Sequence, residues 1–152
     1  MSIRIQTILL ILPLVVILGC CPCNQTQTSN TPLSIDFSSG GGVSGRHSGY
    51  IIMQDGTVRH WESMKGVREN EETVGQLDSE VMDKLRRYVD DSGIFDLVLE
   101  GEGNMTTRLT VIRGERSITH SWSGSTAAQY APENLQPFIT YLNEQLLAFD
   151  IE

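Results

Sequence analysis

The sequence predicts an α+β fold: a single small domain with a mainly antiparallel sheet of about five strands and two packed helices. Three observations predict this class. Short segments with an apolar residue at every second position indicate half-buried strands. The dipeptide Asp55-Gly56 between two such segments is typical of a tight turn, which joins antiparallel strands. Two longer segments, 79–91 and 132–147, repeat their apolar residues at helical spacing.

The first half of the domain is predicted to be mainly strands. Residues 33–38 alternate between apolar and polar, as a strand with one buried face does. Strands at 50–54 and 57–63 follow, joined by Asp55-Gly56, because both turn positions tolerate positive φ. From Met64 to Gln76 the chain is polar, contains two glycines and has no period, so we expect a loop there.

A helix is predicted from Ser79 to about Asp91. Asp78 is placed to cap its first turn, and Gly93 is the expected C-terminal stop. Its apolar residues share one face and are expected to pack on the sheet: Val81, Met82, Leu85, Tyr88 and Val89.

A hairpin and a last helix are predicted for the rest of the domain. Strands are expected at 105–113 and 116–122, and His120 is expected on the apolar face of the second one, beside Trp122. The last helix is expected over 132–147, where Pro132 suits the first turn. Pro137 is expected to kink this helix or to restart it.

The first twenty residues predict a bacterial lipoprotein signal peptide. The apolar stretch Ile8–Leu18 is too short to cross about 30 Å of hydrocarbon at about 1.5 Å per residue. Ile17–Cys20 resembles a lipobox, so residues 1–19 are expected to be removed and Cys20 to carry lipid. The expected location is the cell envelope, on the outer membrane or the outer face of the cytoplasmic membrane. An ordinary secreted protein or an uncleaved N-terminal anchor is the alternative.

The three cysteines, Cys20, Cys21 and Cys23, all lie at this lipid-bearing end. We therefore expect no disulfide in the folded domain, which is predicted to span residues 33–152. Residues 24–32 are polar and uncharged, which is typical of a flexible tether, and the tether is expected to span residues 20–32. A Cys-x-Cys pair lacks the further ligands that a zinc site needs, so we expect no metal there and no cofactor elsewhere.

The charge of the chain argues against nucleic acid as a partner. The formal net charge is −8, and removal of residues 1–19, with Arg4 as their one basic residue, leaves 10 basic and 19 acidic side chains, or −9. An acidic surface is repelled by phosphate backbones and by anionic lipid headgroups. The domain is therefore expected to stand off the membrane on its tether.

The sequence does not indicate an enzyme. Gly40, Gly42 and Gly45 match G-x-G-x-x-G, but a strand follows where a nucleotide-binding motif needs a helix N-terminus. The three histidines, His47, His60 and His120, lack the helical spacing of a zinc protease motif. No G-x-S-x-G segment places a nucleophilic serine, and the paired acidic residues are expected to be solvated charge.

A series of short motifs is similar to the emfourin family over about residues 33–147. They are the segment Phe37–Gly45, the Asp55-Gly56 hairpin, Leu77-Asp78 before a helix, Ser92–Leu97 after it, and Pro132-Glu133-x-Leu135-x-Pro137. The resemblance implies a small bacterial inhibitor of a thermolysin-like zinc metalloprotease such as protealysin. Val43 stands where the family loop usually has an aromatic residue. The likeness of fold does not by itself transfer that function.

The glycine-rich segment is the expected protease-contact loop: Gly40, Gly41, Gly42, Val43, Ser44, Gly45 and Arg46. Bare backbone can enter a cleft too narrow for side chains, and Arg46 would contact acidic groups at the rim. Phe37 and Tyr50 are expected to support its base. Bulky residues at Gly41 and Gly42 are expected to abolish binding while the fold remains.

The alternative function is a lipid-anchored module that binds a protein or glycan of the envelope without inhibiting anything. Trp61 and Trp122 would be its contact residues if they were exposed. The sequence identifies neither the target protease nor an oligomeric state.

Overall fold

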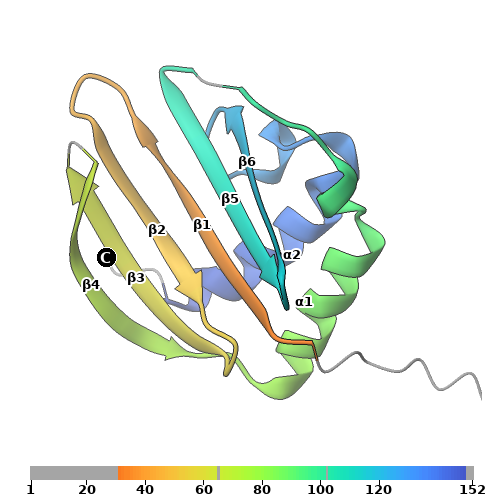
Figure 1. Ribbon diagram of the computed structural model, residues 1–152. Coiled ribbons are helices and arrows are strands. Elements are labelled where there is room, and N and C mark those ends of the chain that lie inside the picture. Colours follow the sequence, from red (N-terminus) through yellow and green to blue (C-terminus); the bar gives the residue numbers. More distant parts are fainter. Residues whose placement is uncertain (1–30, 65, 102, 150–152) are drawn as a thin grey trace, which may run out of the picture.

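A computed structural model describes residues 31–64, 66–101 and 103–149 of the chain. Within them, six strands and two α-helices form one α+β domain, as predicted (Figure 1). The elements are β1 (Leu33–Gly41), β2 (Arg46–Ile52), β3 (Thr57–Met64), β4 (Val67–Gln76), α1 (Ser79–Asp91), β5 (Met105–Arg113), β6 (Arg116–Ser123) and α2 (Gln136–Leu146).

All six strands lie in one sheet in the order β4-β3-β2-β1-β5-β6, and each neighbouring pair is antiparallel. The two helices lie behind the sheet in the view of Figure 1 and leave its other face open. Side chains alternate between the two faces along each strand. The helix-covered face carries the buried apolar residues, and the open face is mostly polar.

The structure contradicts the loop predicted for Met64–Gln76, because β4 occupies most of that segment. This is why the sheet has six strands and not five. Nearly every residue of β4 is exposed, so its sequence shows no apolar period. The strand is held at the edge of the sheet by its ladder with β3 and by the ion pair between Arg59 and Glu71, at 2.8 Å. Charged residues are typical of an edge strand that must not pair with another chain.

The predicted hairpin at Asp55-Gly56 is confirmed. The Asp55 carboxylate accepts a hydrogen bond of 2.9 Å from the backbone N–H of Thr57. This bond, with one from the Thr57 side chain, holds the pKa of Asp55 below its usual value, because both stabilise the charged form. Gly56 has a φ of 87°, as the turn requires.

One apolar core lies between the sheet and the helices. Helix α1 has the predicted bounds, and the Asp78 carboxylate caps it by accepting from the Val81 N–H at 2.8 Å. Its buried residues meet those of β1, β5 and α2, and every buried residue of this core lies between Leu33 and Leu146. Gly93 follows the helix with a φ of 63°, which confirms it as the stop. All of the core that the structure describes therefore lies within the chain from residue 24 onward.

His120 is a buried structural residue of β6, as expected. Its Nε2 atom lies 2.8 Å from the carbonyl oxygen of Ile94. Trp122, on the same face, packs against Phe37 with their ring centroids 6.4 Å apart. Both side chains therefore belong to the core.

The last predicted helix is divided in two. A 3₁₀ turn occupies Glu133–Leu135, and α2 then starts at Gln136 with Pro137 in its first turn. Pro137 therefore restarts the helix, because a residue without an N–H is tolerated where no intrahelical bond is made. In the part of the chain that the structure describes, neither helix is long and apolar enough to span a membrane.

Candidate binding site

The glycine-rich segment forms a tight turn at one end of the sheet. Gly42–Gly45 closes the β1–β2 hairpin, whose last paired residues are Gly41 and Arg46. Gly42 and Gly45 have φ values of 68° and 60°, a region that other residues adopt only at a cost. The N–H of Gly45 donates to the carbonyl oxygen of Gly42 at 3.2 Å. The turn is therefore short and internally bonded.

The predicted seven-residue loop is too long, because Gly40 and Gly41 belong to β1 and Arg46 to β2. Gly40 pairs with His47 on one side and Thr106 on the other. A Cβ on Gly40 would clash with the backbone of His47, and one on Gly41 would clash with the carbonyl oxygen of Asn104. Strands β1, β2 and β5 approach closely here, and this explains why positions 40 and 41 are glycine. Of the seven predicted residues, the four of the turn are therefore the ones that can enter a cleft.

Val43 is the most prominent side chain of the turn, and it is fully exposed. The carbonyl groups of Val43 and Ser44 accept no hydrogen bond from any other described residue. The tip therefore offers an apolar side chain and unpaired backbone acceptors together. Arg46, at the base, is exposed and forms an ion pair with Glu62 at 3.5 Å.

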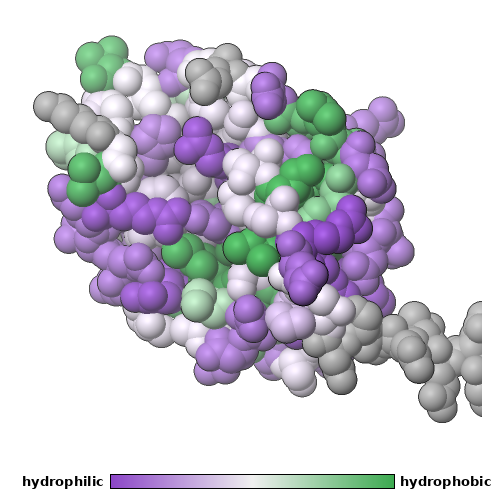
Figure 2. Space-filling model, in the orientation of Figure 1, coloured by the Kyte–Doolittle hydropathy of each residue, from purple (hydrophilic) through white to green (hydrophobic). Residues whose placement is uncertain are grey.

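Three further exposed apolar side chains lie at the same end of the sheet, and we call them with Val43 the apolar rim: Val43, Met64, Val67 and Met105. The strand register brings them together, because Met64 pairs with Arg46 and with Val67, while Met105 pairs with Gly41. Figure 2 shows apolar side chains at this corner of the molecule. The other three members were not predicted from the sequence, because each comes from a different strand end.

The turn is at the opposite end of β1 from the start of the domain (Figure 1). Nine strand residues separate these ends, which corresponds to roughly 25–30 Å. The start of β1 is held by a hydrogen bond from Gly114 N–H to the carbonyl of Pro32, at 2.9 Å. A tether attached before Thr31 would therefore leave the turn pointing away from its anchor.

Phe37 and Tyr50 do not support the turn directly, contrary to the prediction. These two residues pair with each other across the hairpin. Phe37 lies four residues before Gly41 and Tyr50 four residues after Arg46, and Gly41 and Arg46 form the last pair before the turn. Phe37 is buried in the core, and the Tyr50 ring lies against the His60 ring, with the centroids 5.2 Å apart and the planes tilted by 55°. The turn is supported by the backbone ladders of its own strands.

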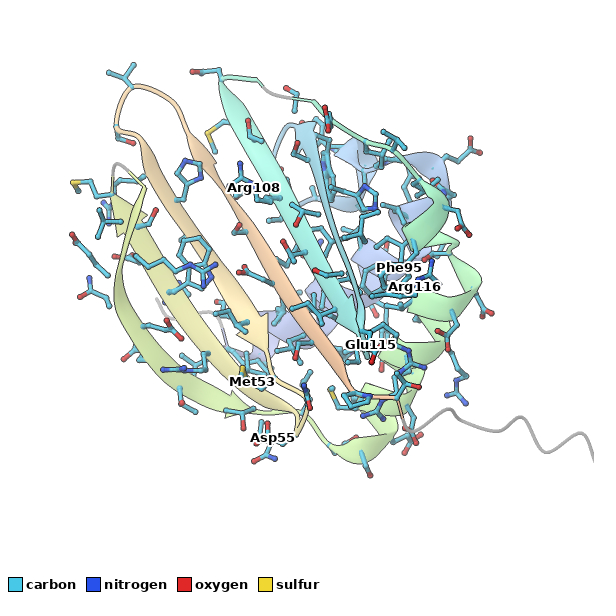
Figure 3. The ribbon with its side chains drawn as sticks, viewed as in Figure 1. Met53, Asp55, Phe95, Arg108, Glu115 and Arg116 are labelled. Carbon is cyan, nitrogen blue, oxygen red and sulfur yellow. The ribbon has the colours of Figure 1, made fainter. Side chains whose placement is uncertain are left out.

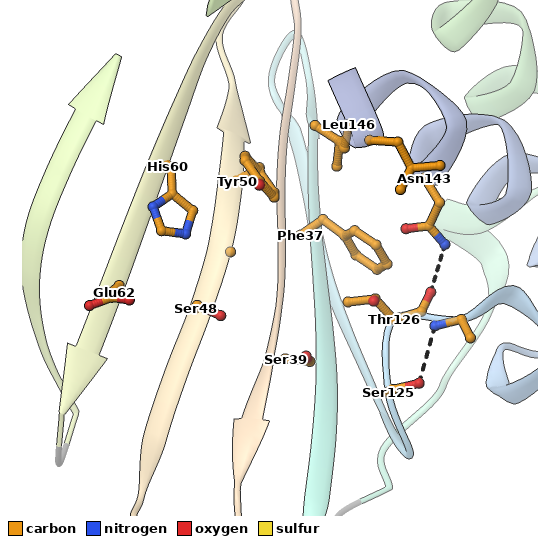
Figure 4. Close-up of a pocket in the computed structure, with 13 residues that line it drawn as sticks. Phe37, Ser39, Ser48, Tyr50, His60, Glu62, Ser125, Thr126, Asn143 and Leu146 are labelled. Carbon is orange, nitrogen blue, oxygen red and sulfur yellow. Dashed lines mark hydrogen bonds between the residues drawn. The ribbon is translucent and has the colours of Figure 1, made fainter. Parts of the chain in front are cut away.

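A cavity of about 550 Å³ lies on the helix-covered face, between strands β1 to β3 and the C-terminal part of α2 (Figure 4). Its lining is rich in hydroxyl and amide groups, including Ser48, Ser125 and Asn143. Asn143 donates to the carbonyl oxygen of Thr126 at 2.8 Å and holds the segment that forms one wall.

Ser48, His60 and Glu62 line this cavity, and these residue types occur in hydrolytic triads. No hydrogen bond joins these three side chains within the residues that the structure describes. The cavity can hold a small polar ligand through its hydroxyl groups.

The structure buries both tryptophans that the alternative function would use. Trp61 and Trp122 are each 6% exposed, so neither presents its ring to a partner. Cys20 and the other cysteines lie outside the described residues, so their lipidation stays a prediction. Among residues 31–64, 66–101 and 103–149, no group of three or more acidic, histidine or cysteine side chains could hold a metal ion.

No protein-family model matches the chain, and no curated protein matches it at a significant level.

Proposed function

We propose that this chain is a lipid-anchored envelope protein that inhibits a thermolysin-like metalloprotease through the turn Gly42–Gly45. The observation that carries the proposal is the exposed Val43 on a short, bonded turn at the end of a six-stranded sheet. The series of motifs that resembles the emfourin family supports the target class. Val43 stands at the position of the aromatic residue in that family.

The proposed contact has an apolar and a polar component. Val43 fills an apolar subsite of the protease, and the other rim residues, Met64, Val67 and Met105, cover the edge of the cleft. A carbonyl group of Val43 or Ser44 faces the zinc ion of the protease or its bound water. Because the turn is already ordered, binding costs less conformational entropy than it would for a mobile loop.

The proposed anchor fits this geometry. Lipid on Cys20 and the polar tether of residues 20–32 would join the domain at the start of β1. The turn lies at the far end of that strand. Inhibition would therefore act on a protease in the space beyond the membrane surface.

The test is a titration of the chain from Asn24 to Glu152 against a thermolysin-like protease from the same organism. Cleavage of a small peptide substrate is the readout, because a small substrate reports occlusion of the active site itself. Stoichiometric loss of activity is the expected result. Full activity at a large molar excess of the chain would overturn the proposal.

The alternative is a non-inhibitory binding module of the envelope, and the cavity of about 550 Å³ favours it. Its contact residues would be the hydroxyl and amide groups of that cavity and not the two tryptophans. Full protease activity in the titration would favour this binding function over inhibition.

A further inference from the structure

The open face of the sheet contains a hollow of about 210 Å³ that is separate from the turn and from the helix-side cavity. The strand register explains it. Arg108, Ser38, Gly49 and Trp61 lie in one row across β5, β1, β2 and β3. Gly49 has no side chain, and a Cβ there would clash with Ser38. Ser38, Trp61 and Arg108 of this row line the hollow.

Among the described residues, the charged groups of the hollow include one cation with no ion-pair partner. Arg68 forms an ion pair with Asp36, and its guanidinium lies over the Trp61 ring, 4.2 Å from the centroid. Arg108 has no ion-pair partner within residues 31–64, 66–101 and 103–149. Figure 3 shows Arg108 on the open face, turned toward the viewer. With two cations and one anion in its lining, the hollow is positively charged on an acidic protein.

A buried polar group lies beside this hollow. The Trp61 side chain lines it and is 6% exposed, and its Nε1 atom has no hydrogen-bond partner in the described part of the chain. A buried N–H group without a partner is costly, and most such groups in proteins are satisfied. Arg108 and Ser38 thus provide donors around one small space, and the buried Trp61 indole lies in its lining.

We propose that this hollow binds the carboxylate group of a carboxylated sugar, such as a uronic acid. The single unpaired cation matches a monoanion, and the planar guanidinium of Arg108 matches a carboxylate in geometry. The Asp36 carboxylate repels a dianion such as phosphate more than it repels a carboxylate, because repulsion grows with ligand charge.

The neighbouring surface favours a sugar over an acidic peptide. A second hollow of about 660 Å³ shares Arg108 and Thr110 with the first, and its lining includes the hydroxyl groups of Thr119 and Ser121. Glu100 lines only this second hollow. The backbone groups of β1 and β5 are used in ladders on both sides, so an extended peptide finds no free strand edge here. Side-chain hydroxyl groups pair with the hydroxyl groups of a sugar ring.

This site is independent of the proposed inhibition, because it uses the open face and not the turn. The test adds sodium glucuronate to the ¹⁵N-labelled chain from Asn24 to Glu152 and follows the two indole N–H signals by NMR. The Trp61 signal is expected to shift in a saturable manner, and the signal of Trp122, which is buried in the core, is expected to stay. Glucose, inorganic phosphate and an Asp-Glu dipeptide are measured in parallel.

Two variants decide the result. Arg108→Gln is expected to weaken glucuronate binding roughly tenfold or more, because it removes a charge-assisted pair. Arg116→Gln is the matched control, since Arg116 is also exposed on the sheet but contacts Phe95 and Asp96, and it is expected to bind as the unchanged chain does. Absence of a Trp61 shift, or equal binding by Arg108→Gln, would overturn the proposal. Stronger binding of the dipeptide or of phosphate than of glucuronate would overturn the ligand class.

Discussion

The backbone N–H of Gly42 donates a hydrogen bond of 2.6 Å to the carbonyl oxygen of Asn104. This bond ties the β1–β2 turn to the residue before β5, which is about sixty positions away in the chain. The turn is therefore part of the sheet and not a loose loop.

The first prediction concerns the two neighbouring glycines of this turn. Gly42→Ala is expected to lower the free energy of unfolding by about 1–2 kcal/mol, because Ala must adopt positive φ there although its Cβ meets no other atom. Gly41→Ala is expected to lower the free energy of unfolding by ~1–3 kcal/mol more than Gly42→Ala does, because its Cβ clashes with the carbonyl oxygen of Asn104. Urea unfolding of both variants measures the difference. Equal losses would show that β1 does not continue to Gly41. Bulky residues at Gly41 are thus not a test of binding alone.

A second prediction separates the apolar tip from other exposed apolar residues. Val43→Asp is expected to weaken inhibition of the target protease at least roughly tenfold, because a charge would have to enter an apolar subsite. Val98→Asp is the matched control, since Val98 is also well exposed but lies in the segment before β5 and outside the turn. The inhibition constants of the two variants are compared with that of the unchanged chain. If both variants inhibit equally well, Val43 is not the contact residue.

The third prediction is a pH dependence at the β2–β3 turn. The pKa of the Asp55 carboxyl is lowered from 3.8 by the backbone N–H and the side chain of Thr57. Because this pKa is lower in the folded state, the hydrogen bonds to the Asp55 carboxylate stabilise the fold above pH 3.8. That stabilisation is lost as the pH falls through the pKa of Asp55 in the folded state. An NMR titration of the Asp55 carboxyl is expected to have its midpoint below 3.8.

Thr57→Val provides the control for this titration. It removes only the side-chain hydrogen bond, so the pKa of Asp55 is expected to rise but to stay below 3.8, since the larger backbone effect remains. An unchanged midpoint in this variant would remove the hydroxyl group from the explanation.

The fourth prediction tests the cap of α1. Asp78→Ala is expected to lower the free energy of unfolding by about 1 kcal/mol, because it removes the acceptor of the Val81 N–H. Asp91→Ala, at the exposed end of the same helix, is expected to change it by less than about 0.5 kcal/mol. Thermal or urea unfolding measures both. A loss at Asp91 as large as that at Asp78 would argue against a specific capping bond.

Local patterns were sufficient for the elements whose residues alternate or repeat against the core. The bounds of α1 and β5, the Asp55-Gly56 turn and the burial of His120 were all predicted from spacing and capping chemistry. Strand β4 was missed because its residues are exposed and polar, so that its structure depends on hydrogen bonds to β3. The extension of β1 through Gly40 and Gly41 was missed for a related reason, since glycine disfavours a strand except where neighbouring backbones approach closely.

The two candidate sites differ in the same way. Gly42–Gly45 was predicted as a contact segment because its residues are contiguous in the chain and its composition is unusual. The row of Arg108, Ser38, Gly49 and Trp61 comes from four strands, and no short segment contains two of its members. Local sequence determines backbone preference and amphipathic spacing within a few residues. Register between distant strands determines which side chains meet, because pairing positions are set by the packing of the whole sheet on its core.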